Sequence, residues 1–480
     1  MSADEAGQTD AAAGDASRVD ERLLLDACGM ADLVRTRQTS ASELLEVHLA
    51  HIARHNDQIN AIVTLDAEGA RAAAAVADAD LANGITHGPL HGVPFTLKDC
   101  HATAGMRTTA GWPGLAEYVP GSDGTIAARL KAAGGILLGK TNVAPLLADV
   151  QTDNAVFGRT NNPWNIERTP GGSSGGAAAA VAAGFSPLDI GSDIGGSIRI
   201  PAHDCGIFGL KPTERRVSND GHIPDLPGGP RMARIMNACG PMARSLPDLA
   251  LALALIQGRD GRDTELSPAP ADGLPQLPTI DPARLRIAWS ARFAALPMSV
   301  DITLATERVA LALEPHVGVL DETLPDVNWE EQRAVRAQLR LYVRMLLEPP
   351  DVLLTAEDYL RTLDARDGFI RIWDAFFQSY DALLCPVQMT TAFPHTPRDT
   401  PVLIDGERQP YALLGDACRP FNLTGHPVVV IPIGLDRDGL PIGVQIVGAR
   451  WDDARLLAIA DFVRHLIPAI PSSPLLRASA

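Results

Sequence analysis

The sequence contains very little lysine. Among its 480 residues lysine occurs only four times, at Lys98, Lys131, Lys140 and Lys211. The remaining strongly basic side chains are arginines, and a guanidinium group does not release its proton at working pH. If the chemistry of this protein requires a lysine that acts as a base, that lysine must be one of these four.

Long apolar runs are also missing. The sequence has no stretch of about 18 consecutive apolar residues, which argues against a membrane-spanning helix. Residues 1–20 are rich in Ala, Ser, Gly and Asp and have neither a basic start nor an apolar core. They predict a disordered tail rather than a secretory signal. We therefore expect a soluble, cytoplasmic protein with no membrane partner.

Positive charge is scarce relative to negative charge. The formal net charge is −17, and 21% of the residues are charged while 46% are hydrophobic. A nucleic-acid-binding surface needs clustered lysine and arginine to neutralise phosphates, so we expect no nucleic-acid partner. The length allows a large hydrophobic core. We expect residues 21–480 to form one domain, present as a monomer or a homodimer.

Several cofactor and metal signatures are absent. The glycine loop at 171–176 does not lead into Gly-Lys-Ser/Thr as a phosphate-binding loop does, and no Gly-x-Gly-x-x-Gly motif follows a strand. His48, His51 and His55 have a spacing that suits a metal, but a solvated helix face is the commoner place for such histidines. We therefore predict no cofactor and no metal. Six cysteines without a CxxC pair predict reduced, mostly buried thiols; they are Cys28, Cys100, Cys205, Cys239, Cys385 and Cys418.

The hydrophobic patterns of helices and strands alternate along the chain. Such alternation predicts the α/β class, with helices that cover a sheet. A proline-rich stretch over residues 267–282 predicts a surface loop or linker within the domain. Periodicity, caps and glycine stops predict helices over residues 41–55, 66–82, 123–133, 302–313, 356–380 and 453–465. Short apolar runs predict strands over residues 93–97, 136–138, 285–289, 428–433 and 442–447.

Two glycine-rich loops lie close together in the sequence, and each contains serine. Residues 171–176 read GGSSGG and residues 192–197 read SDIGGS. Two such loops indicate backbone packed tightly around a reacting group. Ser173 also fits the Gly-x-Ser-x-Gly pattern of a nucleophile elbow, for which His395 or His426 would complete a triad. Because this short pattern is common by chance, an α/β-hydrolase-type carboxylesterase is an alternative and not the main hypothesis.

The aromatic residues of the helix predicted over 356–380 allow two interpretations. The simpler one places Trp373, Phe376, Phe377 and Tyr380 in the core. The other places Trp373 and Phe377 in an apolar acyl or aryl pocket, because small-molecule sites are mostly hydrophobic.

Motifs along most of the chain resemble one known family. They are LHGVP at 90–94, KD at 98–99, GKTN at 139–142, NNPW at 161–164, the two serine loops, GGSIRIP at 195–201, GLKPT at 209–213, FNLTG at 421–425 and GLPIG at 439–443. Together they resemble the amidase signature family over roughly residues 25–465. The resemblance implies a single α/β domain with a large, mixed, twisted sheet covered by helices on both faces.

The resemblance assigns a catalytic role to three residues. The family's lysine falls on Lys98, its bridging serine, which sits at a cis peptide, falls on Ser173, and its nucleophile falls on Ser197. The backbone amides of the family's oxyanion hole fall on Ile194, Gly195, Gly196 and Ser197.

Further family positions support the two loops. Ser174, Asp193 and Arg199 match residues that hold the loops together, and we expect Arg199 to form an ion pair. By spacing alone, Leu147 is placed in the substrate pocket.

The sequence also departs from the family pattern. After Lys-Pro-Thr the family usually has a variable residue and then Gly-Arg, whereas this chain has Glu214-Arg215-Arg216. Ser192 and Ile194 stand where threonines are frequent. We expect neither departure to touch the three catalytic positions, and the first to reshape a surface loop.

A lysine can act as a base only when it is neutral. Lys98 follows the apolar run 93–97, and burial there would lower the pKa of its ammonium group by desolvating the charged form. Asp99 would raise that pKa if it lay close, but successive strand side chains point to opposite faces, so we expect it to point elsewhere. On residue type alone, Lys140 and Lys211 remain alternative bases.

The resemblance implies an amidohydrolase that cleaves C–N bonds of linear small-molecule amides through an acyl-enzyme. The family includes aryl acylamidases, fatty acid amide hydrolases and enzymes that cleave urethanes or nylon oligomers. We expect a preference for apolar acyl or aryl groups, with carbamates and esters as further substrates. An alternative is the amidase-family subunit of a glutamyl-tRNA amidotransferase, which the acidic balance, Ser192 and Ile194 disfavour.

Overall fold

The computed structural model describes residues 19–226, 229–268, 274–345, 351 and 353–477. All but the last two residues of the predicted tail 1–20 lie outside this range. Part of the predicted loop 267–282 also lies outside it. Residues 267–268 and 274–281 form neither a helix nor a strand, and Pro282 begins a short 3-10 helix, Pro282–Arg284.

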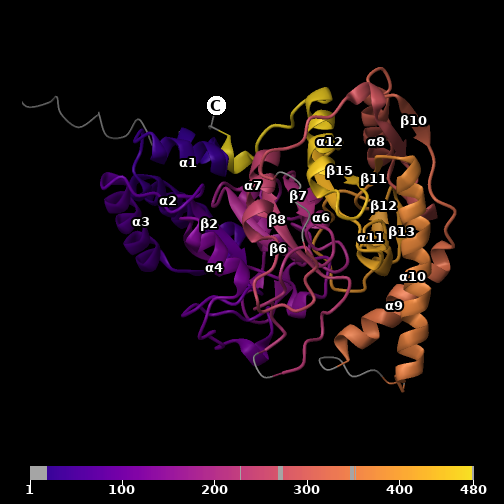
Figure 1. The fold of residues 1–480 in the computed structure, drawn as a ribbon, viewed down its shortest axis with the longest axis horizontal. Helices are drawn as coiled ribbons and strands as arrows, with labels where there is room; N and C mark the ends of the chain where they lie inside the picture. Colours follow the sequence, from indigo (N-terminus) through magenta and orange to yellow (C-terminus); the bar gives the residue numbers. More distant parts are fainter. Residues whose placement is uncertain (1–18, 227–228, 269–273, 346–350, 352, 478–480) are drawn as a thin grey trace, which may run out of the picture.

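The centre of the fold is a mixed sheet of 11 strands in the order β1-β3-β2-β6-β8-β7-β14-β15-β11-β9-β10 (Figure 1). β2 pairs in parallel with β3 and β6, while β6, β8, β7, β14 and β15 are antiparallel neighbours. Strands from the first and last thirds of the chain therefore share one sheet. The strands are β1 (Ile62–Leu65), β2 (Pro94–Lys98), β3 (Ile136–Thr141), β6 (Leu188–Asp193), β7 (Phe208–Lys211), β8 (Ala238–Ala243), β9 (Arg286–Trp289), β10 (Val319–Glu322), β11 (Ala382–Pro386), β14 (Val428–Leu435) and β15 (Pro441–Val447).

Helices and two small hairpins surround this sheet. The α-helices are α1 (Ala27–Arg35), α2 (Ala41–Ile59), α3 (Ala67–Ala82), α4 (Thr125–Ala132), α5 (Gly175–Ala182), α6 (Arg199–Cys205), α7 (Leu246–Ile256), α8 (Val300–Leu313), α9 (Trp329–Arg344), α10 (Ala356–Ser379), α11 (Arg419–Leu423) and α12 (Asp453–Leu466). The hairpins are β4 (Asp153–Asn154) with β5 (Gly158–Arg159) and β12 (Val402–Ile404) with β13 (Glu407–Gln409).

Alternate residues of the central strands face different layers, because successive side chains of a strand point to opposite sides. In β14, Val429, Ile431 and Ile433 belong to the largest hydrophobic core, to which α7, α8 and α12 contribute. Val428 and Val430 face the other side, where α5, α6 and the region of α9–α11 pack. The predicted α/β class, with a large mixed sheet covered on both faces, is confirmed.

The helix α5 is completely buried and fixes the position of the first serine loop. Its sequence is GGAAAAVA, and all eight residues are buried. A Cβ atom at Gly176 would lie 2.3 Å from the backbone nitrogen of Asn142, the residue that follows β3. Only glycine therefore allows the start of this helix, and the serine before it, to approach β3 so closely.

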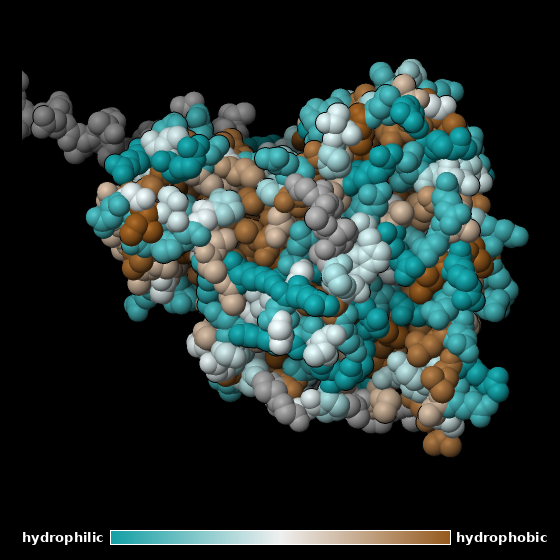
Figure 2. Space-filling view, viewed as in Figure 1, coloured by the Kyte–Doolittle hydropathy of each residue, from teal (hydrophilic) through white to brown (hydrophobic). Residues whose placement is uncertain are grey.

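The exposed face in Figure 2 is mainly hydrophilic, with a group of hydrophobic residues where α10 begins. Leu353 and Leu360 in this region are 88% and 61% exposed. Within the described residues, none of the helices combines the length and the apolar character that crossing a bilayer requires.

The elements predicted from periodicity are present, with boundaries that differ by a few residues. The helix predicted over 41–55 runs to Ile59 and begins with the expected capping box, in which Ser40 accepts from the Glu43 amide and Glu43 accepts from the Ser40 amide. The strand predicted over 136–138 continues to Thr141. The pattern ended early there because Gly139, Lys140 and Thr141 are not apolar, although all three are buried.

Candidate active site

Both serine loops line one cavity of about 670 Å³. Ser173 comes from the loop before α5, whereas Ser197 and Gly195 come from the loop that joins β6 to α6. Leu147, for which the spacing predicted a place in the substrate pocket, lines the same cavity. Helix α9 supplies a further part of the wall.

Lys98 is the last residue of β2, and its side chain is fully buried next to this cavity. Its Nζ atom lies 2.8 Å from Ser173 Oγ, 3.0 Å from Ser192 Oγ and 3.3 Å from the Ser192 carbonyl oxygen. Burial lowers the pKa of Lys98 by desolvating the ammonium form, and Cys100 and Asp193 oppose this shift less strongly. The site thus holds a lysine that loses its proton more easily than usual, in contact with a serine hydroxyl.

Asp99 points away from Lys98, as predicted. Its Oδ2 atom accepts hydrogen bonds from the Thr109 amide at 3.0 Å and from Thr109 Oγ1 at 2.6 Å. Burial raises the pKa of the Asp99 carboxyl to about 6. This carboxylate therefore belongs to the neighbouring loop rather than to the lysine site.

The two serine loops are joined directly. The Ser174 amide donates to the Ser197 carbonyl oxygen at 3.2 Å, and Ser174 Oγ lies 3.4 Å from the Ser192 carbonyl oxygen. The peptide bond between Gly172 and Ser173 is cis. Ser197 is 8% exposed, so its hydroxyl is buried except on the side of the cavity.

A buried ion pair fixes the shape of the second loop. Arg199 Nη2 lies 3.0 Å from Asp193 Oδ1, and Arg199 Nε lies 3.0 Å from Asp193 Oδ2. Asn422 donates to Asp193 at 2.8 Å and accepts from Arg199 at 2.6 Å. Burial alone would raise the pKa of Asp193, but Arg199 and the hydrogen bonds hold it below its usual value. Because both charges are satisfied by bidentate contacts, the loop is held rigidly.

The backbone amides of this loop divide into two groups. The Gly196 amide donates to Asp193 Oδ1 at 2.7 Å, so it is engaged in the loop itself. The amides of Ile194, Gly195 and Ser197 have no hydrogen-bond partner in the part of the chain that the structure describes. The expectation of four oxyanion-binding amides is therefore wrong for Gly196 in this conformation, because the neighbouring carboxylate already accepts its proton.

The other three lysines do not reach either serine. Lys140 Nζ bonds the His101 carbonyl oxygen and lies 3.2 Å from Thr108 Oγ1. Lys131 pairs with Asp123, and Lys211 donates to the carbonyl oxygen of Pro212 at 2.9 Å. Lys98 alone among the four lysines is in contact with both serine loops.

The nucleophile-elbow alternative for Ser173 is wrong. His426 Nδ1 bonds Thr424 Oγ1 at 2.8 Å, and His426 Nε2 lies 3.3 Å from Asp374 Oδ1. His426 does not line the cavity. His395 also lies outside the cavity lining. Ser173 Oγ instead contacts Lys98 Nζ, and no histidine of the described chain forms a hydrogen bond with Ser173.

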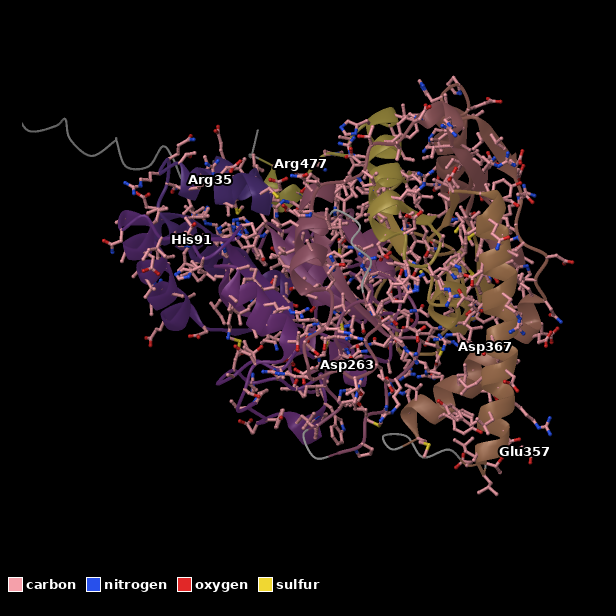
Figure 3. All side chains as sticks on the ribbon, viewed as in Figure 1. Arg35, His91, Asp263, Glu357, Asp367 and Arg477 are labelled. Carbon is pink, nitrogen blue, oxygen red and sulfur yellow. The ribbon has the colours of Figure 1, made fainter. Side chains whose placement is uncertain are left out.

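Of the three histidines on α2, His48 and His51 are buried, whereas His55 is partly exposed. His48 Nδ1 bonds the Leu44 carbonyl oxygen at 3.0 Å and His51 Nε2 bonds the Ala183 carbonyl oxygen at 2.8 Å. His91, labelled in Figure 3, similarly bonds the Ala77 carbonyl oxygen at 3.0 Å. His48, His51 and His91 are therefore each engaged with a backbone oxygen.

The proposed pocket role of the aromatic residues in α10 is wrong. Trp373 is 0% exposed and packs against Trp329, Phe377 and Phe421 in a core cluster. Neither Trp373 nor Phe377 lines the cavity. The helical spacing of these residues marks a buried face, and the neighbouring helices fill the space that a ligand would need.

Three residues of the site were missed. Ser192 was expected not to touch the catalytic positions, but its hydroxyl lies 3.0 Å from Lys98 Nζ. His222 lines the cavity, and both of its ring nitrogens lack a partner among the described residues. Arg336 lines the cavity from α9. The alternation of β6 could have placed Ser192 beside the lysine, whereas no sequence signal places α9 against the serine loops.

Comparison with known proteins places the chain in a family. The family model described as Amidase matches residues 43–327 and 317–457. The chain therefore belongs to the amidase signature family, and the motif resemblance is confirmed.

Individual relatives cover most of the chain. A glutamyl-tRNA(Gln) amidotransferase subunit of Roseiflexus sp. (strain RS-1) is 37% identical in an alignment 475 residues long, and the alignment covers 89% of this chain and 93% of the relative. The solved structure of a 6-aminohexanoate cyclic dimer hydrolase aligns with a TM-score of 0.81 and 30% identity over 96% of this chain and 100% of its own. The solved structure of a bacterial aryl acylamidase of the amidase signature family aligns with a TM-score of 0.76 and 26% identity, over 95% of this chain and 96% of its own.

Proposed function

We propose that the protein hydrolyses linear small-molecule amides through an acyl-enzyme on Ser197, with Ser173 as proton relay and Lys98 as base. The contact of 2.8 Å between Lys98 Nζ and Ser173 Oγ, at the wall of a cavity that also contains Ser197, carries the proposal. A serine hydroxyl is a poor nucleophile without a base within hydrogen-bond reach. The buried lysine and the intervening serine supply that base.

Acylation begins with a proton transfer. Ser197 Oγ attacks the carbonyl carbon while its proton passes to Ser173 Oγ, and the Ser173 proton passes to neutral Lys98. The carbonyl oxygen becomes an oxyanion beside the amides of Ile194, Gly195 and Ser197. Preorganised donors of this kind lower the barrier, and the loss of one typically costs about 3 kcal/mol.

Collapse of this intermediate breaks the C–N bond. Ser173 donates a proton to the departing nitrogen and regains one from protonated Lys98. Water then attacks the ester on Ser197 by the same route in reverse, which releases the acid and restores the free hydroxyl. Esters and carbamates pass through a similar oxyanion, so we include them as further substrates.

The acyl-enzyme is the most specific intermediate of this mechanism. Acid quenching during turnover of butyryl p-nitroanilide, followed by mass spectrometry of proteolytic peptides, should show a butyryl group on the peptide that contains Ser197. The same peptide from Ser197→Ala should remain unmodified. An acyl group on the Ser173 peptide instead would overturn the assignment of the nucleophile.

A second candidate function follows from one comparison. The curated relative at 37% identity is named as one subunit of a glutamyl-tRNA(Gln) amidotransferase. A protein of that kind would depend on partner subunits. Amide hydrolysis by the purified single chain would favour the stand-alone amidase, and activity only with added partner proteins would favour the amidotransferase subunit.

A further inference from the structure

The side chain of Arg336 lies over the second serine loop. Arg336 belongs to α9 and lines the cavity together with Gly195 and Ser197. A Cβ atom built on Gly195 would lie 2.8 Å from Arg336 Nη2 and 4.0 Å from Arg419 Cγ. The guanidinium group therefore covers the residue two positions before the proposed nucleophile.

Arg336 has no anionic partner within the described chain. It forms neither a hydrogen bond nor an ion pair there, and its buried Nε atom is unsatisfied. The adjacent Arg419 differs, because it pairs with Asp416. Arg336 is thus a half-buried cation at the cavity wall that no carboxylate of the described chain contacts directly.

The electrostatic surroundings make this arrangement costly. Burial lowers the pKa of Arg336, and the positive charges of Arg419 and Arg340 lower it further. The carboxylates of Asp416 and Asp193 oppose this shift less strongly. A guanidinium group nevertheless keeps its proton at working pH. The charge persists, so a bound anion would relieve both the desolvation and the repulsion.

The carboxylates of the cavity wall do not supply this anion. Asp149 Oδ1 accepts from the Tyr411 hydroxyl at 2.6 Å and from the Val150 amide at 2.7 Å. Asp225 Oδ1 accepts from the Met232 amide at 3.0 Å, while its Oδ2 has no hydrogen-bond partner among the described residues. The third acid of the wall, Asp399, lies 3.9 Å from Arg398. None of these three carboxylates forms an ion pair with Arg336.

We infer that the substrate of this site is an amide that carries a carboxylate, and that Arg336 binds this carboxylate while Ser197 attacks the amide. The inference rests on the proposed amidase function and names its substrate class. A planar guanidinium group matches a carboxylate with two parallel hydrogen bonds, and such contacts are about twice as strong as neutral ones. Arg336 is then a specificity-determining residue.

Matched substrates test this inference on either side of the scissile bond. Glutaryl and pentanoyl p-nitroanilide differ by a carboxylate on the acyl side, and N-butyryl-3-aminobenzoate and butyranilide differ by one on the amine side. In at least one pair the acid should have a kcat/KM about tenfold or more above its neutral partner, which corresponds to about 1.4 kcal/mol. Arg336→Gln should remove this difference, because the acid should lose much more kcat/KM than its neutral partner does.

The matched control is Arg333→Gln, which removes an exposed arginine from the same helix outside the cavity lining. It should keep the preference for acids. Equal loss of acid and neutral rates in Arg336→Gln would overturn the inference, because it would assign Arg336 to the oxyanion or to the fold. Equal hydrolysis of acid and neutral substrates by the unaltered enzyme would also overturn it and would leave the amidase function intact.

A binding measurement separates the inference from catalysis. In the Ser197→Ala background, calorimetric titration compares glutaranilic acid with pentananilide and N-butyryl-3-aminobenzoate with butyranilide. In at least one of these two pairs the acid should bind more tightly than its neutral analogue. Adding Arg336→Gln should abolish that advantage. An advantage that is absent, or that survives the added substitution, would overturn the inference whether or not the enzyme turns over any anilide.

Discussion

Lys98 and Lys140 stand on neighbouring parallel strands and point to opposite faces of the sheet. In the pairing of β2 with β3, Lys140 lies opposite Leu97 and Thr141 lies opposite Lys98. Lys140 consequently shares the face of Leu97 and bonds the loop at His101, whereas Lys98 contacts Ser173. This register decides between two buried lysines that residue type alone leaves equivalent.

The first prediction concerns these two lysines. Lys98→Met should lower kcat/KM for a p-nitroanilide by about 10²–10⁴-fold, because it removes the proposed base. Lys140→Met should change stability but keep kcat/KM of the folded protein within a few-fold. The rates should be compared after circular dichroism has confirmed that both variants fold. A larger loss in Lys140→Met would contradict the assignment of the base.

The second prediction concerns pH. Only neutral Lys98 accepts a proton, so kcat/KM should rise as the pH increases through the pKa of Lys98 and then level off. Burial lowers that pKa, so the midpoint should lie below the ordinary lysine value of 10.5. A pH profile of kcat/KM measures it. A rate that falls with increasing pH across this limb would be incompatible with a lysine base.

The third prediction concerns the aromatic core beneath α10. Trp373→Ala should lower the free energy of unfolding by about 3–5 kcal/mol, because it creates a cavity among large side chains. KM of the protein that remains folded should change little, since Trp373 does not line the cavity. Leu147→Ala, at the cavity wall, is the comparison and should change KM instead. Urea titrations and kinetics at low temperature provide both quantities.

The fourth prediction concerns a departure from the family pattern. Arg215 stands where the family usually has glycine, and its φ angle is 65°. This left-handed conformation disfavours a residue with a Cβ atom. Arg215→Gly should raise the free energy of unfolding by up to about 1 kcal/mol, as measured by urea denaturation. Lower stability would mean that the exposed Arg215 side chain contributes more than the backbone strain costs.

The sequence predicts the elements and the proximity of the three proposed catalytic residues better than it predicts the residues around them. Periodicity places Lys98 at the end of a buried strand, and the dense motifs place Ser173 and Ser197 in adjoining loops. The spacing of Trp373 and Phe377 shows that they share a helix face, but it does not reveal what covers that face. Only tertiary packing answers that question.

The cavity wall shows the same limit. Arg336 lies on α9, more than a hundred residues from either serine loop, and its sequence context is that of an ordinary amphipathic helix. Its contact with the second loop depends on the path of the chain between β10 and α10. The engagement of the Gly196 amide by Asp193 is likewise a matter of loop conformation, which motif identity alone does not specify.

The central claim is that Ser197 is the nucleophile of a stand-alone amidase. The most direct measurement is release of p-nitroaniline from a short-acyl anilide by the purified protein and by Ser197→Ala. The account predicts steady release by the unaltered enzyme and none above background from the variant. Release by Ser197→Ala at a comparable rate would contradict it.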